Sequence, residues 1–183
     1  PENPHPDLDF ALEGSVENGT VEEGPLGGGA EEAHGEHTAG TATGAADPAG
    51  DVPRYGVAPN ADLLMADVFA GGAATEDIIA SMEWAADNDA DVASFSLGVP
   101  SQQGLSTFVN LYVGVIRDVK ASGTLPVVSA GNAGGTGNVG GDNGGPVSSP
   151  ATNFNSVAVG ASNDAGEIAS FSSGALINDQ SIE

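Results

Sequence analysis

The chain has 183 residues, which suits one domain or a large part of one. It carries 26 acidic residues against 3 Lys and Arg, a formal net charge of -23. So few cations cannot neutralise a nucleic-acid backbone or form a basic patch on a membrane surface, which excludes both partners. The absence of cysteine excludes disulfides and thiolate metal sites, and no apolar run approaches the roughly 20 residues of a membrane-spanning helix.

The acidity has two interpretations. Acidic chains with few aromatic residues are often disordered. The alternative is a protein adapted to concentrated salt, because at about 1 M salt the screening length falls to roughly 3 Å and self-repulsion is suppressed. Most of the large apolar residues follow Tyr55, and that part of the chain is dense enough to build a core. We therefore favour a folded, salt-adapted protein.

The first half of the chain predicts one loop, two helices and a strand. Residues 1–33 are rich in Gly and Glu and predict an extended entry followed by a flexible surface loop. The small residues at 39–46 suit a helix that packs tightly against its neighbours. Residues 62–68 (DLLMADV) predict a buried strand, broken by two glycines. Thr75 is the expected N-cap of an amphipathic helix that runs to about Ala86.

The second half continues the alternation of strands and helices. Strands are predicted at 92–96, 125–130 and 156–160, and an amphipathic helix is marked by Leu105, Phe108, Val109, Tyr112, Val113 and Ile116. Gly123 lies where a C-terminal cap belongs. This alternation predicts an α/β fold with a parallel sheet covered by helices on both faces. Chemistry is then expected in the loops at the carboxyl ends of the strands.

The glycine-rich segment 131–145 has no lysine, so it is not a phosphate-binding loop. We interpret it as a flexible surface loop.

Two of the three histidines, His34 and His37, share one face of the predicted helix and flank Glu36. Three interpretations stay open for them: a base for nucleophilic catalysis, a metal site with Glu36, or plain surface histidines. The metal site lacks both the H-E-x-x-H order of zinc hydrolases and an evident third ligand.

The segment 34–41 (HGEHTAGT) resembles the H-G-T-H-x-A-G motif around the catalytic histidine of subtilisin-like serine proteases. Seven other segments resemble family motifs in the same order along the chain. They are HPDL at 5–8, YGVAP at 55–59, SLG at 96–98, SAGN at 129–132, SSPA (loosely) at 148–151, VAVGA at 157–161 and ASFSS at 169–173. We identify the chain as similar to the subtilase family, and its acidity suggests a halolysin-like, haloarchaeal member.

The resemblance implies a three-layer subtilisin-like α/β fold with a mostly parallel sheet flanked by helices, of which residues 1–183 form a partial domain. It implies a secreted serine endopeptidase that acts on peptide or protein substrates, outside the cell or at its surface, without a catalytic cofactor. His34 would be the general base, and Asn132 would donate its side-chain amide to the oxyanion.

The family's substrate and metal sites transfer to further residues. Ser96, Leu97 and Gly98 would pair with an extended substrate, while Ala130 and Gly131 would form the opposite wall of the specificity pocket. Asp7 corresponds to a position that often binds a structural calcium ion in the family. The alternative for Asp7 is a solvated surface charge.

Two triad members have no match. The family's catalytic aspartate precedes H-P-D-L, but only four residues precede His5, and Asp7 and Asp9 belong to the following segment. The nucleophile normally lies in a G-T-S-M-A segment beyond A-S-F-S-S, and the sequence given ends at Glu183 without one; Ser172 and Ser173 are not substitutes.

We therefore expect this chain alone to be inactive. It would be the middle of a longer protease whose N- and C-terminal pieces complete the triad, an excised fragment, or a non-catalytic scaffold that serves assembly or binding at a surface.

Overall fold

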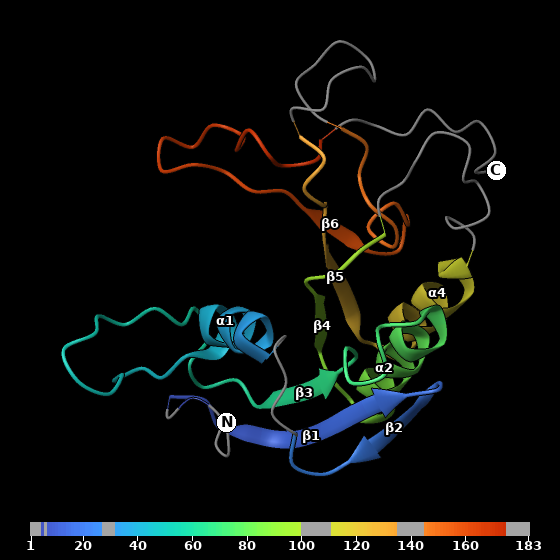
Figure 1. Cartoon of the computed structure of the whole chain (residues 1–183), viewed down its shortest axis with the longest axis horizontal. Helices are drawn as coiled ribbons and strands as arrows, with labels where there is room; N and C mark the ends of the chain where they lie inside the picture. Colours follow the sequence, from blue (N-terminus) through green and yellow to red (C-terminus); the bar gives the residue numbers. More distant parts are fainter. Residues whose placement is uncertain (1–4, 6, 27–31, 100–110, 135–144, 175–183) are drawn as a thin grey trace. The chain divides into compact units, whose positions relative to one another are not determined.

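The computed structural model describes residues 5, 7–26, 32–99, 111–134 and 145–174. The chain forms two compact units, Pro1–Trp84 and Ala85–Glu183. Each unit contains a three-stranded sheet of its own (Figure 1).

The first unit begins with a β-hairpin. Strand β1 (Phe10–Glu17) pairs antiparallel with β2 (Thr20–Glu23). The connection is a two-residue turn in which Asn18 and Gly19 both have positive φ, 51° and 72°. This turn geometry favours Asn-Gly because its twist matches that of the flanking strands. The prediction of an extended entry and a surface loop is therefore wrong for Phe10–Glu23.

Strand β3 (Leu63–Asp67) pairs with β1 in parallel, which gives the strand order β2-β1-β3. Helix α1 (Glu32–Thr43) lies between β2 and β3 in the sequence and packs against β3. The approach is close, because a Cβ on Gly35 would lie 2.6 Å from the Met65 Cε atom. The predicted helix of small residues is confirmed, although it ends at Thr43 and not at 46.

Helix α2 (Thr75–Asp87) begins at the predicted place, with a different cap. Ala74 is the N-cap, since its carbonyl accepts a hydrogen bond from the Ile78 N–H at 3.1 Å. The Asp77 carboxylate accepts the Ala74 N–H at 3.2 Å and, on its other oxygen, the Gly19 N–H at 2.8 Å. Thr75 as N-cap is therefore wrong by one residue. The capping side chain is Asp77, which also holds the hairpin turn against the helix.

The second unit contains a fully parallel sheet. Strands β4 (Val92–Phe95), β5 (Leu125–Ser129) and β6 (Val157–Val159) lie in that order. Helix α4 (Val113–Ser122) packs against β5 and ends at Gly123, whose φ of 117° confirms the predicted C-cap. The predicted helix positions Leu105, Phe108 and Val109 lie outside the described residues.

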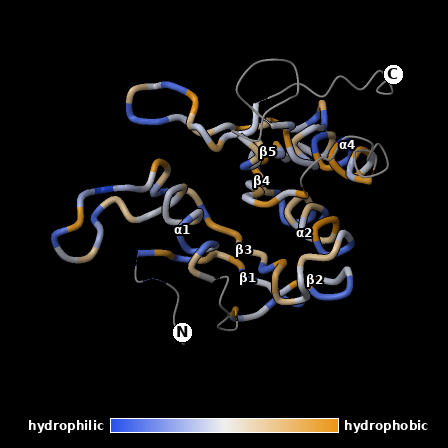
Figure 2. Tube along the Cα trace, turned by 45° about the horizontal axis from the view of Figure 1, so that its top comes forward, coloured by the Kyte–Doolittle hydropathy of each residue, from blue (hydrophilic) through white to orange (hydrophobic). Residues whose placement is uncertain are grey.

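The α/β class is confirmed, and three of the four pairings among the described strands are parallel. The described strands form two three-stranded sheets, β2-β1-β3 in the first unit and β4-β5-β6 in the second. Figure 2 shows hydrophobic residues along β3 and around β5. None of the described helices is long and apolar enough to cross a membrane. The buried apolar residues are Leu8, Val16, Ala39, Val68, Ile78 and Met82 in the first unit, and Ala93, Phe95, Tyr112, Ile116, Val119, Val128, Ala130 and Ala151 in the second.

We expect Asp77→Ala to destabilise the first unit by about 1–3 kcal/mol, because it leaves two backbone N–H groups without their acceptor. Asp77 is only 1% exposed. Glu83→Ala removes an exposed carboxylate from the same helix and is the matched control. Urea unfolding measures both variants, and equal midpoints would contradict the capping role.

Candidate active site

The two predicted substrate-binding segments leave the same edge of the second unit's sheet. Phe95 is paired with Val128 in the parallel ladder, so Ser96–Gly98 and Ala130–Gly131 follow neighbouring strand ends. The Ser129 hydroxyl donates to the Leu97 carbonyl at 3.4 Å, which links the two segments directly.

Ser148 lies against both segments. Its N–H donates to the Ala130 carbonyl at 2.8 Å. A Cβ on Gly98 would lie 3.0 Å from the Ser148 Cβ, and a Cβ on Gly131 would overlap the Ser148 hydroxyl. The next residue, Ser149, exchanges two backbone hydrogen bonds with Val99, of 2.8 and 3.0 Å. The segment 148–149 therefore joins the two walls of the candidate substrate site, and glycine is required where it approaches them.

Asn132 sits on a turn directly after β5. Gly131 has a φ of 102°, which turns the chain away from the strand and leaves Asn132 exposed. Ser173 holds this turn on both sides of Asn132. Its N–H donates to the Gly131 carbonyl at 2.8 Å, and its hydroxyl accepts the Ala133 N–H at 3.0 Å.

The hydroxyls of Ser172 and Ser173 serve the backbone. The Ser172 hydroxyl accepts the Ala161 N–H at 3.0 Å and donates to the Ser173 carbonyl at 3.2 Å. Ser172 and Ser173 are 2% and 3% exposed. The positioning roles of Ser148 and Ser173 were not predicted from the sequence. The signal was present, since both lie in segments that resemble family motifs.

The two histidines of α1 belong to the first unit, whereas Ser96–Gly98 and Ala130–Asn132 belong to the second. His34 lies in the first turn of the helix, and both His34 and His37 are exposed. Among the residues that the structure describes, no three His, Asp or Glu side chains are grouped to hold a metal ion. Within the described residues, the structure therefore adds no third ligand to the metal site considered for His34, Glu36 and His37.

Asp7 contacts protein donors through both carboxylate oxygens. One accepts the Ala49 N–H at 3.0 Å, and the other accepts the Tyr55 hydroxyl at 3.0 Å. The bond from Ala49 is the main cause that lowers the pKa of Asp7, and Tyr55 and His5 add to it against an opposing desolvation. The pKa of Tyr55 is raised, mainly by desolvation and to a lesser extent by its hydrogen bond to Asp7.

Calcium prefers six to eight oxygen ligands. The surroundings of Asp7 do not fit that preference, because N–H and O–H donors face its carboxylate and no group of three acidic or histidine ligands exists in the described parts of the chain. Calcium at Asp7 stays a prediction of the resemblance.

The family model described as the Subtilase family, Peptidase S8, matches residues 2–182. The chain belongs to the subtilase family. An alkaline protease of Alkalihalobacillus alcalophilus is 35% identical over 142 residues, which cover 76% of this chain and 32% of the relative. Subtilisin E of Bacillus subtilis (strain 168) is 34% identical over 172 residues, which cover 92% of this chain and 40% of the relative. This subtilase chain thus spans less than half the length of these two relatives.

The solved structures that are similar to this subtilase chain include the following two. The S218A mutant of the protease domain of PatA superimposes with a TM-score of 0.71, at 23% identity over 95% of this chain and 58% of that one, and it shows the fold alone. Sphericase superimposes with a TM-score of 0.54, at 28% identity over 73% of this chain and 42% of that one. They agree with the subtilisin-like fold predicted from the sequence.

We expect Ser173→Ala to loosen the turn that carries Asn132, because the Ala133 N–H loses its acceptor. One lost hydrogen bond corresponds to an exchange rate of the Ala133 amide proton that is about tenfold faster. Ser170→Ala, at an exposed position of the same segment, is the control. Hydrogen exchange read by NMR measures the effect. An unchanged exchange rate of the Ala133 amide in Ser173→Ala would refute the role of Ser173 in holding the turn around Asn132.

Proposed function

We propose that the protein containing this chain is a subtilisin-like serine endopeptidase that cleaves peptide or protein substrates. The observation that carries the proposal is the placement of Asn132. In a chain that belongs to the subtilase family, this exposed amide follows the left-handed Gly131 at the carboxyl end of β5, and Ser173 fixes its turn from both sides. A preorganised amide donor stabilises the oxyanion of acyl transfer, and losing one typically costs about 10²–10³ in turnover.

His34 is the general base of this proposal. It would take the proton of a nucleophilic serine during attack on the scissile carbonyl and return that proton to the leaving amine. Its exposed position in the first turn of α1 supports this role. We assign the triad serine and aspartate to no residue of this chain, and we expect the 183-residue chain alone to be inactive.

The substrate would lie in an extended conformation along Ser96–Gly98 and pair with its backbone as an added strand. Ala130, which is 4% exposed, and Gly131 would form the opposite wall of the pocket for the residue before the scissile bond.

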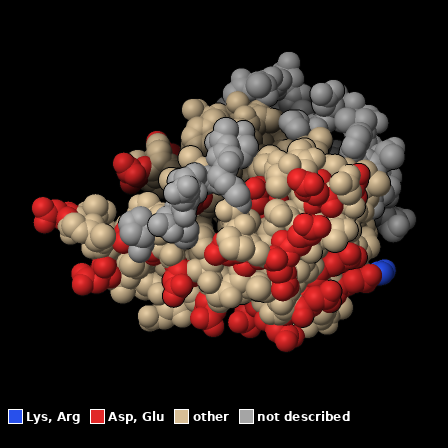
Figure 3. Space-filling view, turned by 60° about the horizontal axis from the view of Figure 1, so that its bottom comes forward, with Lys and Arg blue, Asp and Glu red and all other residues tan. Residues whose placement is uncertain are grey.

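Salt adaptation and secretion belong to the same proposal. The net charge of -23 supports a halolysin-like enzyme that works outside the cell or at its surface in concentrated salt. On the face drawn in Figure 3, Asp and Glu side chains greatly outnumber Lys and Arg side chains.

We expect His34→Ala to lower turnover by about 10²–10⁴-fold, the usual contribution of a general base. His37→Ala, one turn further along α1 and also exposed, should leave turnover nearly unchanged. The measurement is peptide hydrolysis by the protein at its full natural length in high salt, together with labelling by a fluorophosphonate that reacts with an activated serine. A folded protein that neither hydrolyses peptides nor takes the label would support the non-catalytic scaffold instead.

We also expect the protein to lose its cooperative thermal transition when molar salt is replaced by dilute buffer, because 26 acidic residues then repel one another with little screening. Circular dichroism followed across a salt series tests this. A cooperative melt with the same midpoint in dilute buffer would rule out salt adaptation.

A further inference from the structure

The segment between α1 and β3 is bonded to the C-terminal end of α1. The Val57 N–H donates to the Thr41 carbonyl at 3.3 Å, and the Ala58 N–H donates to the Ala42 carbonyl at 2.8 Å. The last carbonyls of a helix have no partner within the helix, so the segment completes the end of α1.

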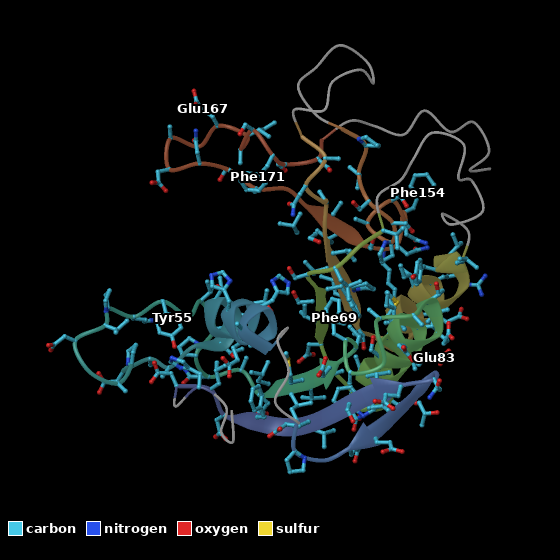
Figure 4. All side chains as sticks on the ribbon, viewed as in Figure 1. Tyr55, Phe69, Glu83, Phe154, Glu167 and Phe171 are labelled. Atoms are coloured by element: carbon cyan, nitrogen blue, oxygen red, sulfur yellow. The ribbon has the colours of Figure 1, made fainter. Side chains whose placement is uncertain are left out.

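Tyr55 places its ring on the glycine face of this helix. A Cβ on Gly40 would lie 3.2 Å from the Tyr55 Cε2 atom, and a Cβ on Gly44 would overlap the ring. A Cβ on Gly56 would overlap the Gly44 backbone, so the chain beside Tyr55 also touches the helix end directly. In Figure 4, Tyr55 lies beside α1. Gly40 of α1 and Gly44, one residue beyond its end, therefore form the surface that receives this ring.

Asp7 contacts this segment at two places, Ala49 and Tyr55. Its carboxylate accepts the Ala49 N–H and the Tyr55 hydroxyl, each at 3.0 Å, across 42 and 48 residues of sequence. The Asp7 side chain is 7% exposed. Arg54 adds bonds within the segment, to the carbonyls of Gly56 at 3.2 Å and Val57 at 3.3 Å.

We propose that Asp7 and Tyr55 form a metal-free latch that fixes residues 49–58 on α1, and that Tyr55 is thereby a positioning residue for the helix that carries His34. A bound cation would repel the N–H and O–H hydrogens that point at the Asp7 carboxylate. The Ala49 N–H and the Tyr55 hydroxyl each occupy one carboxylate oxygen of Asp7, and together they join the distant segments that a calcium ion would otherwise join. The positioning part of the inference rests on the proposed function; the latch does not.

The first test separates the latch from a calcium site. Thermal midpoints of the protein at its full natural length are measured in EDTA and in calcium for the wild type, Asp7→Ala and the control Asp9→Ala, an exposed carboxylate nearby. We expect Asp7→Ala to lower the thermal midpoint by the same amount in EDTA and in calcium. Any rise in the midpoint that calcium causes by binding elsewhere in the protein should then be the same in Asp7→Ala as in the wild type. A gain in the wild type that Asp7→Ala abolishes would overturn the proposal.

Tyr55→Phe keeps the ring on the glycines and removes only the hydroxyl, so it covers the case in which Asp7→Ala does not fold. We expect amide protons in α1 to exchange about tenfold faster in Tyr55→Phe, in EDTA and in calcium alike, because a hydrogen bond to a charged group is lost. Exchange in α4 of the second unit is the internal control. Unchanged exchange throughout α1 would overturn the latch.

The positioning role has its own readout. In the active protein, Tyr55→Phe should lower kcat several-fold and leave KM nearly unchanged, since the substrate segments belong to the second unit. An unchanged kcat together with faster α1 exchange would overturn the positioning role and keep the latch. A wild type without activity would refute the proposed function, and with it the positioning role, while the melting and exchange experiments still decide the latch.

Discussion

The parallel pairing of β4, β5 and β6 is the constraint on which the candidate site depends. Strands that run in the same direction end at the same edge, so the segments that follow β4 and β5 emerge as neighbours. The pairing of Phe95 with Val128 sets that register. A register shift of one residue would reverse the faces of the strands and move Asn132 away from the Leu97 segment, because side chains alternate along a strand.

Close approach of distant segments occurs in both units, and glycine permits it each time. In the second unit, Gly98 and Gly131 accommodate Ser148, which joins the walls of the candidate substrate site. In the first unit, Gly44 and Gly56 let the segment after α1 lie directly on the helix. Glycine loses more conformational entropy on folding than other residues, so these positions lower the free energy of unfolding. In return they allow the close contacts beside the residues proposed to act in catalysis.

The latch also suits a chain of such charge. At about 1 M salt the screening length is near 3 Å, so attraction between separated charges contributes little. Asp7 instead contacts an amide and a hydroxyl, neutral donors at hydrogen-bonding distance. Contacts of this kind keep most of their strength in salt, and they need only one of the many carboxylates of this chain. A latch built on one carboxylate and neutral donors is therefore compatible with both the acidity and the proposed salt adaptation.

Local signals in the sequence were enough for the class of fold and most of its elements. Apolar runs predicted β3, β4, β5 and β6, because a buried strand needs consecutive apolar residues. Gly123 predicted the end of α4, because a left-handed backbone at a helix end favours glycine. Motifs in family order indicated the subtilase family, and the family match over residues 2–182 confirms it. The hairpin at Phe10–Glu23 could also have been predicted, since Asn18-Gly19 is a strong turn signal.

Other features arise only in the folded chain. The sequence could not show that Asp77 would replace Thr75 as the capping residue, since its second partner, Gly19, lies 58 residues away. It could not show that Ser173 bonds to Ala133, next to Asn132, across 40 residues, or that Asp7 bonds to Tyr55 across 48. Pattern and composition therefore determined the elements and the family, because both depend on neighbouring residues. Tertiary structure alone decided which polar groups meet, because those pairings depend on how distant segments pack.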